Sequence, residues 1–374
     1  MTGRLEVVSA GPLATLQDLG RPGWRRWGVP KSGALQPDWL RIANRLVNQP
    51  DGAAAIEFFV TGPTLKAAAG PLRLGFAGDF AITLERANGE RSAVQAWRSL
   101  TLLTGDSVRI GALRTARAGY IAAAGLRLPR VLGSAATYTR AQIGGLHGRA
   151  LAAGDCLEAG DGPETADRLK AADGPAANPA PMQAAALRAE RQLTPPPAPD
   201  FSPIRVVPGP QADHFSAAVL AAFFAADYQV SADADRMGLR LQGPALVHRS
   251  DAPDKGAEIV SDATVPGSIQ VPGNGQPIVL LADGQTAGGY PKIGTVASAD
   301  LPRLALAAIG SRLRFEAVTV AQAEALARQH EAAVQRLLAR IGPLRMDAGI
   351  DLDAIYAHNL VSGMIDARDP GDLA

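Results

Sequence analysis

The sequence QPIVLLADGQTAGGYPKIG occupies residues 276–294. Its apolar run from Pro277 to Ala282 is short and is bounded by glycine and proline, which is typical of a buried strand. The run leads into a turn that begins at Asp283 and contains two adjacent glycines. This pattern predicts a β domain that gathers polar side chains where a strand ends, as binding loops do on rigid scaffolds.

Short apolar runs separated by glycine also fill the first half of the chain, from Leu5 to about Leu157. Three of them are Leu72–Phe76, Ala81–Leu84 and Leu100–Leu103. Such runs predict the strands of a sandwich or barrel. A helix is expected among them, because apolar residues recur at helical spacing after Pro37 and Asp38, at Trp39, Ile42, Ala43, Leu46 and Val47.

The second half repeats this mixture of strands and helices. A strand is expected at Ile204–Val207, followed by a helix with one apolar face made by Phe215, Ala218, Val219, Ala222 and Phe223. Strands are expected between Tyr228 and Ala297 and again at Arg312–Ala317, and the pattern becomes helical after Val318. The predicted fold class is therefore mainly β with some α.

The length of 374 residues exceeds the roughly 250 to 300 residues at which one hydrophobic core stops growing, which predicts two domains. Residues 159–203 are rich in alanine and proline and end in Pro195-Pro196-Pro197-Ala198-Pro199, so they predict a linker. We expect an N-terminal β domain over 1–158, a second β domain over 204–318 and a helical tail over 319–374.

Composition excludes several classes of protein. Lysine and arginine number 37 against 36 acidic residues, so the net charge of +1 offers no broad basic surface for nucleic acid. Neither a signal peptide nor an apolar run of about 18 residues is visible, which predicts a cytoplasmic protein without a membrane span. Cys156 is the single cysteine and is expected to pack as a small hydrophobic residue. No histidines pair at metal-ligand spacing, so no metal site is predicted.

Three segments combine glycine, proline and polar residues in the manner of binding loops. The first covers Thr15–Gly23 and Gly28–Ala34, where glycines permit tight turns and Gln17, Asp18, Arg21 and Ser32 carry donors and acceptors toward one ligand. The alternative is a turn-rich connection with a local pair between Asp18 and Arg21.

The second segment is Ser231–Gly238, where Arg236 follows Asp235. An arginine beside carboxylates binds a substrate carboxylate or is simply held by the neighbouring acids.

The third segment contains Gln270, Asp283, Thr286, Gly288, Gly289, Tyr290 and Lys292. Backbone amides at Gly288-Gly289 can approach a bound anion closely, and Lys292 can stabilise an oxyanion or hold a carboxylate. An exposed lysine at a strand end is the alternative.

Several cofactor motifs are absent from the sequence. It has no phosphate-binding loop and no dinucleotide fingerprint, and His330-Glu331 lacks the second histidine of a zinc protease helix. It also has no biotin attachment segment. We therefore expect no covalently bound cofactor, and biotin takes part only if another chain carries it.

At these segments the chain resembles the family of allophanate hydrolase subunit 2, also described as urea amidolyase-related or biotin-dependent carboxyltransferase proteins and, in prokaryotic 5-oxoprolinase, as the subunit designated C. The resemblance covers about residues 5–320. It rests on the loop segments at 15–23 and 28–34 and on Leu132-Gly133-Ser134, Pro208-Gly209-Pro210-Gln211, Asp235-Arg236-Met237-Gly238 and Gly288-Gly289-Tyr290-Pro291-Lys292.

This resemblance implies two cyclophilin-like β-barrel domains and a partner similar to allophanate hydrolase subunit 1. It implies a subunit of an ATP-dependent 5-oxoprolinase, inactive alone, that acts on a small amide or lactam together with a lactam-activating third subunit. The nucleotide site is not indicated. The alternatives are a carboxyltransferase that moves a carboxyl group from carboxybiotin to urea or another amide, and a non-catalytic regulator that binds the partner.

In either catalytic reaction, negative charge on an amide or carboxyl oxygen must be stabilised. Lys292, Arg236 and the Gly288-Gly289 amides are the candidate donors. Tyr290, Asp235 and Asp283 are the candidates for proton handling or orientation. We expect Gln17, Arg21, Ser32, Arg236, Gln270, Tyr290 and Lys292 to meet in one cleft, since pockets gather a few polar groups on apolar walls.

Limited proteolysis tests the domain boundaries. We expect cleavage between about Glu158 and Pro203 to leave two folded fragments, because proline-rich connections are exposed and poorly hydrogen-bonded. Mass spectrometry of the fragments locates the cuts. Resistance of this stretch under conditions that nick a terminus would contradict the two-domain prediction.

Overall fold

The computed structural model describes residues 3–160, 190–201, 203–249 and 256–344. Most of the predicted linker, residues 161–189, and the end of the predicted helical tail, residues 345–374, lie outside the described residues. The described chain up to Pro343 belongs to one compact unit. The domain boundaries of the sequence analysis therefore stay a prediction, and below "first half" means residues 3–160 and "second half" residues 203–317.

The first half contains two antiparallel sheets, with strand orders β11-β1-β4-β9-β6-β7 and β2-β3-β10-β5-β8. Alternating apolar residues of both sheets, such as Leu5, Ile82, Leu16 and Phe76, form one buried cluster. The two sheets therefore share a core, as in a sandwich. Their strands are β1 (Gly3–Ser9), β2 (Leu13–Gln17), β3 (Ala55–Phe59), β4 (Thr64–Ala69), β5 (Leu72–Ala77), β6 (Phe80–Glu85), β7 (Arg91–Val94), β8 (Ser99–Leu102), β9 (Ser107–Leu113), β10 (Ala118–Ala123) and β11 (Cys156–Ala159).

The predicted helix of the first half is α1 (Pro37–Leu46), which contacts β5 and β10 of the five-stranded sheet. Its buried side chains include Trp39, Ile42, Ala43 and Leu46, so the predicted apolar stripe is confirmed. Gly75 of β5 allows this contact, because a Cβ there would collide with the Ala43 carbonyl. The outer face of the sheet is thereby covered by a helix.

The second half closes a seven-strand barrel in the order β13-β20-β17-β18-β15-β14-β21. β13 and β21 close the ring in parallel, and the other neighbours are antiparallel. The bounds are β13 (Ile204–Pro208), β14 (Asp227–Val230), β15 (Gly238–Gln242), β17 (Ser268–Gln270), β18 (Ile278–Leu280), β20 (Lys292–Val296) and β21 (Arg312–Ala317). A two-stranded sheet of β16 (Asp262–Ala263) and β19 (Ala287–Gly288) lies beside it.

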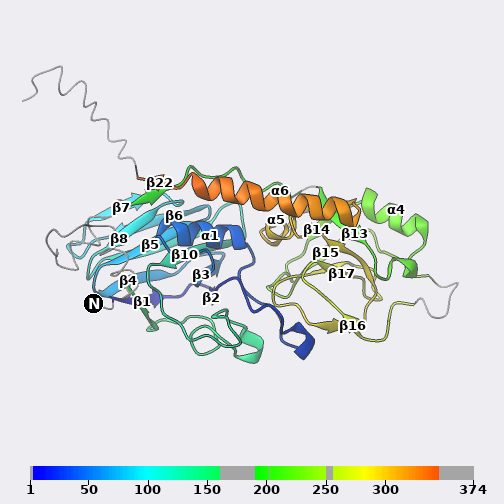
Figure 1. Cartoon of the computed structure of the whole chain (residues 1–374), viewed down its shortest axis with the longest axis horizontal. Helices are drawn as coiled ribbons and strands as arrows, with labels where there is room; N and C mark the ends of the chain where they lie inside the picture. The colour runs from blue at the N-terminus through cyan, green and yellow to red at the C-terminus, as the bar shows by residue number, and fades with distance from the viewer. Residues whose placement is uncertain (1–2, 161–189, 202, 250–255, 345–374) are drawn as a thin grey trace, which may run out of the picture. The chain divides into compact units, whose positions relative to one another are not determined.

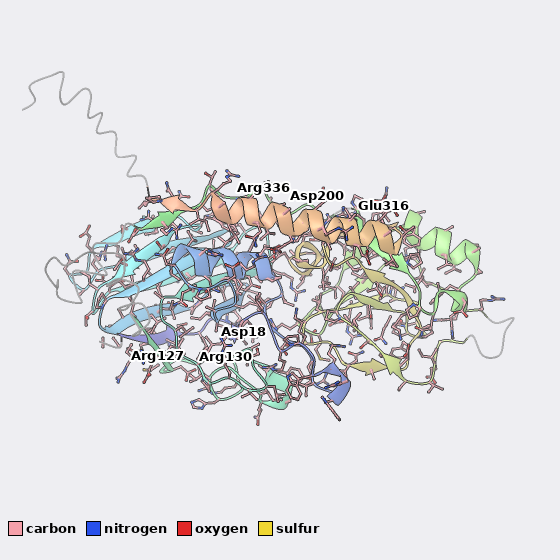
Figure 2. The ribbon with its side chains drawn as sticks, in the orientation of Figure 1. Asp18, Arg127, Arg130, Asp200, Glu316 and Arg336 are labelled. Carbon is pink, nitrogen blue, oxygen red and sulfur yellow. The ribbon has the colours of Figure 1, made fainter. Side chains whose placement is uncertain are left out.

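The longest helix of the described residues is α6 (Val320–Ala339), which contacts both α1 and β13 and therefore bridges the two halves (Figure 1). Its inner face buries Val334 and Leu338, whereas Arg336 projects outward (Figure 2). The remaining short elements are α4 (Ala217–Ala225), α5 (Leu301–Ala305), η1 (Arg25–Trp27), η2 (Thr139–Ala141), η3 (Ala212–His214) and the pair β12 (Arg191–Gln192) with β22 (Gly342–Pro343).

Polar contacts hold α6 against α1. Arg41 donates two hydrogen bonds to the Glu331 carboxylate, at 2.9 and 2.8 Å, and the His330 ring nitrogen lies 3.0 Å from Asp38. The hydrogen bond with Asp38 raises the pKa of His330 above its ordinary value, although burial opposes this shift. The helical segment predicted after Val318 thus packs across the described fold.

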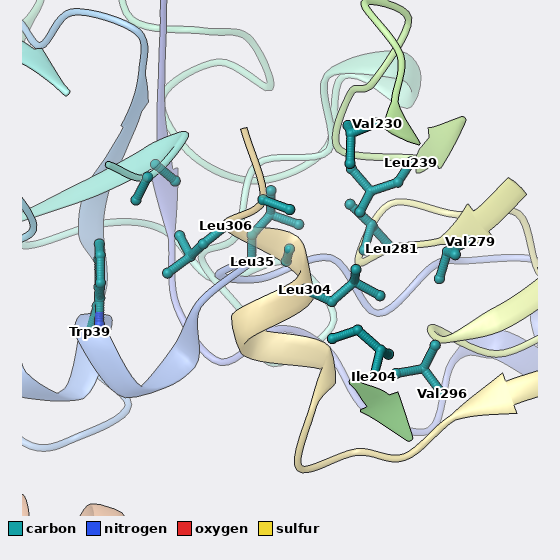
Figure 3. Packing of buried hydrophobic residues seen from close by; sticks show 14 of the residues in the cluster. Leu35, Trp39, Ile204, Val230, Leu239, Val279, Leu281, Val296, Leu304 and Leu306 are labelled. Carbon is teal, nitrogen blue, oxygen red and sulfur yellow. The ribbon is translucent and has the colours of Figure 1, made fainter. Parts of the chain in front are cut away.

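A single apolar cluster continues from one half into the other. Leu35 and Trp39 of the first half belong to the same cluster as Ile204, Val296 and the other inward-facing residues of the barrel (Figure 3). Leu304 and Leu306, in and after α5, lie among these side chains. The halves are therefore joined by a core and not only by surface contacts.

The mainly β fold class is confirmed, with strands at Ile204–Pro208 and Arg312–Ala317 where the pattern predicted them. The prediction for Cys156 is wrong, because this residue is exposed on the edge strand β11. Within the described residues no helix is long and apolar enough to cross a membrane.

The barrel core can be tested with two adjacent phenylalanines of α4. Phe223 is fully buried and stacks on Phe315 with a ring-centroid distance of 4.8 Å, whereas Phe224 is partly exposed. We expect Phe223→Ala to lower the free energy of unfolding by about 3 to 5 kcal/mol, because it leaves a cavity. Phe224→Ala is the matched control and should cost clearly less in urea unfolding followed by circular dichroism. Equal losses would show that Phe223 is not part of the barrel core.

Candidate functional site

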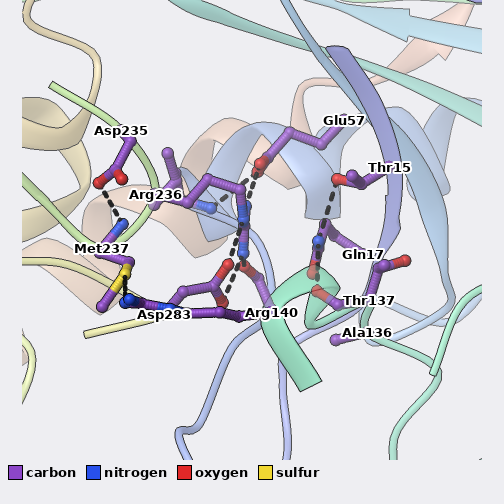
Figure 4. Close-up of polar contacts among 12 residues, drawn as sticks. Thr15, Gln17, Glu57, Ala136, Thr137, Arg140, Asp235, Arg236, Met237 and Asp283 are labelled. Atoms are coloured by element: carbon purple, nitrogen blue, oxygen red, sulfur yellow. Dashed lines mark hydrogen bonds and ion pairs between the residues drawn. The ribbon is translucent and has the colours of Figure 1, made fainter. Parts of the chain in front are cut away.

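Arg236 joins the two halves of the chain. It precedes β15 and is 7% exposed. Its guanidinium donates to both carboxylate oxygens of Asp283, at 2.8 and 3.2 Å, to Glu57 of β3 and to the Gly33 carbonyl at 2.7 Å (Figure 4). Burial works against the charged form, but Asp283 and Glu57 outweigh it and raise the pKa of Arg236. The guanidinium is therefore charged and held in a fixed orientation.

Glu57 is in turn held by the first half. It is fully buried and accepts hydrogen bonds from the Tyr120 hydroxyl at 2.5 Å and the Leu35 amide at 2.8 Å. Burial and then the neighbouring Glu57 carboxylate raise the pKa of Tyr120 well above its ordinary value, so the hydroxyl remains a donor. Neither Glu57 nor Tyr120 was among the site residues predicted from the sequence. The available signal was a glutamate inside the apolar strand Ala55–Phe59.

A cavity of about 920 Å³ lies between the halves beside this network. Leu13 and Thr15 of β2 and the segment 138–140 form the wall from the first half. The barrel contributes the other wall, which includes five of the predicted site residues: Asp235, Arg236, Gln270, Asp283 and Tyr290. The structure thus brings these five together around one cleft, while Lys292, Gln17, Arg21 and Ser32 do not line it.

The predicted residues in the cleft differ in exposure and in how many of their polar atoms are already hydrogen-bonded. Asp283 is bound by Arg236 on both oxygens, so it orients the guanidinium. Asp235 caps its own turn, because its Oδ1 accepts from the amides of Met237 and Gly238 at 2.7 and 3.0 Å. Tyr290 is 40% exposed at the cleft. Gln270 is buried and accepts from the Gln285 side chain at 2.8 Å, while its Nε2 has no partner in the described part of the chain.

Asp18 organises the loop that follows β2. One carboxylate oxygen accepts from the Gly20 amide at 2.7 Å and from the Ser134 hydroxyl at 2.6 Å, and the other accepts from the Ala135 amide at 2.7 Å. No ion pair between Asp18 and Arg21 is found among the described residues. Asp18 therefore stabilises the loop and does not form the local ion pair with Arg21.

Gln17, Arg21 and Ser32 are buried next to this loop and are not fully hydrogen-bonded. Arg21 donates to the Ala136 carbonyl, and the Gln17 amide donates to Thr137 at 3.0 Å. Within the described ranges, Arg21 Nε and Nη1, Gln17 Oε1 and Ser32 Oγ have no partner. Burial lowers the pKa of Arg21, although Asp18 and Asp283 oppose the shift. Unpaired buried polar atoms are uncommon, and they concentrate here in the predicted loop residues.

Lys292 lies on β20 with its side chain 2% exposed, and its ammonium is 2.8 Å from the Asp262 carboxylate. The expected donor is therefore paired and buried, unlike an exposed lysine at a strand end. Gly288 and Gly289 support β16: Gly288 pairs with Asp262, and the Gly289 carbonyl accepts from Ile259 at 2.9 Å. The Thr286 carbonyl accepts from the Thr264 amide at 3.0 Å.

Three histidines of the described residues, His214, His248 and His330, have structural surroundings. His214 is buried with its Nδ1 3.0 Å from the Gly256 carbonyl, and His248 lies 3.0 Å from the Val271 carbonyl and against the ring of Phe215. His248 and His330 are both partly buried and hydrogen-bonded. No group of side chains suited to a metal ion was found among the described residues.

Fold and site together define a mainly β protein in which a closed barrel and a two-sheet unit enclose a polar cleft around a buried arginine. A family described as "Carboxyltransferase domain, subdomain A and B" matches residues 27–317. The chain belongs to this family.

Two relatives are named as the same subunit of 5-oxoprolinase, the one designated C. The protein of Haemophilus influenzae is 34% identical over 334 residues, which is 87% of this chain and 95% of that protein. The protein of Escherichia coli is 34% identical over 317 residues, which is 83% of this chain and 90% of that protein. The family resemblance found in the sequence is therefore confirmed.

A solved relative is the urea carboxylase of Kluyveromyces lactis. It is 25% identical, with a TM-score of 0.73, over 89% of this chain. The match covers 29% of that enzyme, so this chain spans less than a third of its length. The comparison supports the fold and the family.

Replacing Arg236 tests the network between the halves. We expect Arg236→Gln to lower the free energy of unfolding by about 3 kcal/mol or more, because it leaves Glu57 and Asp283 buried without their cation. Arg314→Gln is the control, since Arg314 forms an exposed pair with Asp227 and such pairs contribute little. Urea unfolding of both variants gives the comparison. A similar small effect of both would mean that Arg236 does not hold the halves together.

Proposed function

We propose that this chain is a subunit of an ATP-dependent 5-oxoprolinase-type amidohydrolase that converts 5-oxoproline to glutamate. It acts with a partner similar to allophanate hydrolase subunit 1 and with a third subunit that activates the lactam. The observation that carries the proposal is the 34% identity to two relatives named as 5-oxoprolinase subunits, along 90% or more of their length. The polar cleft between the halves supports it as a place for a small amide.

Opening a lactam places negative charge on the carbonyl oxygen, and fixed donors lower the energy of that state. Arg236 suits this task because Glu57 and Asp283 hold its guanidinium at the cleft. In this proposal Asp283 orients Arg236, whereas Tyr290 and Asp235, which both line the cleft, handle protons. Lys292, which pairs with Gln270 across β17 and β20, supplies further positive charge.

The substrate would contact Arg236 and Gln270 in the cleft. The loop that follows β2 would be shaped by Gln17, Asp18, Arg21 and Ser32. The turn beside Gln270 would be shaped by Thr286, Gly288 and Gly289. A buried amide donor without a partner among the described residues, Gln270 Nε2, is available to an oxygen of the substrate. ATP would be used by the assembled enzyme. Biotin would enter only on another chain.

Transfer of a carboxyl group is the second candidate function. It is favoured by the carboxyltransferase description of the family and by the shared fold with the Kluyveromyces lactis urea carboxylase. In that reaction the same cleft would receive an amide nitrogen and a carboxylated biotin from another chain.

Reconstitution with each subunit omitted in turn tests the proposed function. The chain alone should not turn over 5-oxoproline, and the complete mixture should release glutamate when ATP is present. Lys292→Ala should lower this rate by about a hundredfold or more, because one charge-stabilising donor is lost. Lys66→Ala, on an exposed position of β4, is the matched control and should keep the full rate.

Two outcomes decide between the alternatives. Full activity without this chain would overturn the enzyme-subunit proposal in favour of a regulator that binds the partner. Carboxylation of urea by a mixture containing a carboxybiotin-bearing protein, without glutamate release from 5-oxoproline, would support the carboxyltransferase instead.

A further inference from the structure

The two partners of the ion pair between Lys292 and Asp262 differ in burial. The lysine side chain is 2% exposed and comes from a central strand of the barrel, whereas the Asp262 side chain is 48% exposed. Asp262 belongs to the two-residue strand β16, whose pairing with β19 is equally short. The counter-ion of the buried Lys292 ammonium is thus a half-exposed carboxylate on a two-residue strand. So short a strand separates from its neighbours at little cost in free energy.

Other donors converge on this carboxylate. The Gln211 side chain donates to the Asp262 oxygen that Lys292 also contacts, at 3.0 Å, and Lys292 and then Gln211 lower the pKa of Asp262. The main chains of Gln211 and Lys292 are also linked, since the Gln211 amide donates to the Lys292 carbonyl at 3.1 Å. The backbones that carry the two donors are therefore linked to each other independently of Asp262.

Gln270 adds a buried donor that has no partner. It pairs with Lys292 across β17 and β20, so the two side chains lie on the same face. Its Nε2 lies against Gly288, which is the residue opposite Asp262, and a Cβ at Gly288 would collide with this nitrogen. Among the described residues this Nε2 has no acceptor. Of Lys292, Gln211 and Gln270, Gln270 is the one that lines the cleft.

We propose that Lys292, Gln211 and Gln270 form a binding site for the carboxylate of a small ligand, and that Asp262 occupies this site as an internal counter-ion until the ligand displaces it. The inference rests on the proposed function for the identity of the ligand, which is then the carboxylate of 5-oxoproline. The preference for a carboxylate follows from the three donors Lys292, Gln211 and Gln270 alone. In the exchange Lys292 passes from one carboxylate to another, so the buried ammonium is never left unpaired, which would be costly.

The proposal makes Asp262 a competitor of the ligand. Asp262→Asn removes the competing charge, keeps the size of the side chain and leaves Lys292 in need of an anion. We expect this variant to bind 5-oxoproline about tenfold or more tightly than the unaltered chain, the scale of one charge-assisted hydrogen bond. It should not gain affinity for 2-pyrrolidinone, which is the same lactam without the carboxylate. Isothermal titration calorimetry on the full chain measures both.

Asp227→Asn is the matched control, because Asp227 has the same exposed fraction of 48% and pairs with Arg314 elsewhere on the barrel. It should leave the affinity for 5-oxoproline unchanged. Adding Lys292→Met to Asp262→Asn should abolish the gain, with folding checked by circular dichroism. If Asp262→Asn binds 5-oxoproline no more tightly than Asp227→Asn does, Asp262 is not a competitor for that ligand.

A second measurement separates this site from the proposed function. Acetate, at constant ionic strength against chloride, should raise the midpoint of thermal unfolding of Asp262→Asn and not that of Asp227→Asn. Stabilisation by acetate without tighter binding of 5-oxoproline would support the carboxylate site and reject 5-oxoproline as its ligand. Absence of both effects would overturn the inference and leave the pair between Asp262 and Lys292 as a structural contact.

Discussion

The ion pair of Arg236 with Glu57 crosses from the barrel to the five-stranded sheet, and the arrangement of the cleft depends on it. A buried charge is tolerated only when it is paired and hydrogen-bonded, so a guanidinium at this position requires carboxylates from its surroundings. Asp283 comes from the barrel, but Glu57 comes from the first half and is itself held by Tyr120. The need to neutralise Arg236 therefore sets how the two halves meet.

Apolar packing and the long helix reinforce the same arrangement. The cluster that contains Trp39 also contains the inward-facing residues of the barrel, so separation of the halves would expose core side chains to water. Helix α6 spans the junction, and the contact between Arg41 and Glu331 fastens it to α1. A cleft supported in this way keeps its polar groups in place before a ligand arrives, which favours binding and catalysis by pre-organisation.

The buried polar residues at the site differ in how completely they are hydrogen-bonded, and this difference bears on function. Arg236 is fully engaged, whereas Gln270, Arg21 and Ser32 retain buried atoms without partners in the described structure. A protein tolerates such atoms at a cost to stability, and a ligand that satisfies them recovers that cost. This is a physical reason to associate these loops with binding, in a chain whose family relatives are named as a 5-oxoprolinase subunit and as urea carboxylase.

The local elements and the family could both be predicted from the amino-acid sequence. Spacing of apolar residues located α1 and the strands β13 and β21, because helical and strand periods are properties of neighbouring residues. Glycine and proline motifs located the loops that line or support the cleft. The strand predicted at Pro277–Ala282 is shorter, Ile278–Leu280, because its ends join the turns around the cleft.

Which charged residues pair with one another depends on the folded arrangement of the chain. Glu57 and Arg236 are 179 positions apart, and no periodicity relates two residues at that separation. Local sequence likewise does not show that Lys292 pairs with Asp262 of β16, or that Cys156 is exposed on an edge strand although Leu157 beside it is buried. The physical reason is that charge pairing and exposure depend on how strands from both halves are packed, which local sequence does not encode.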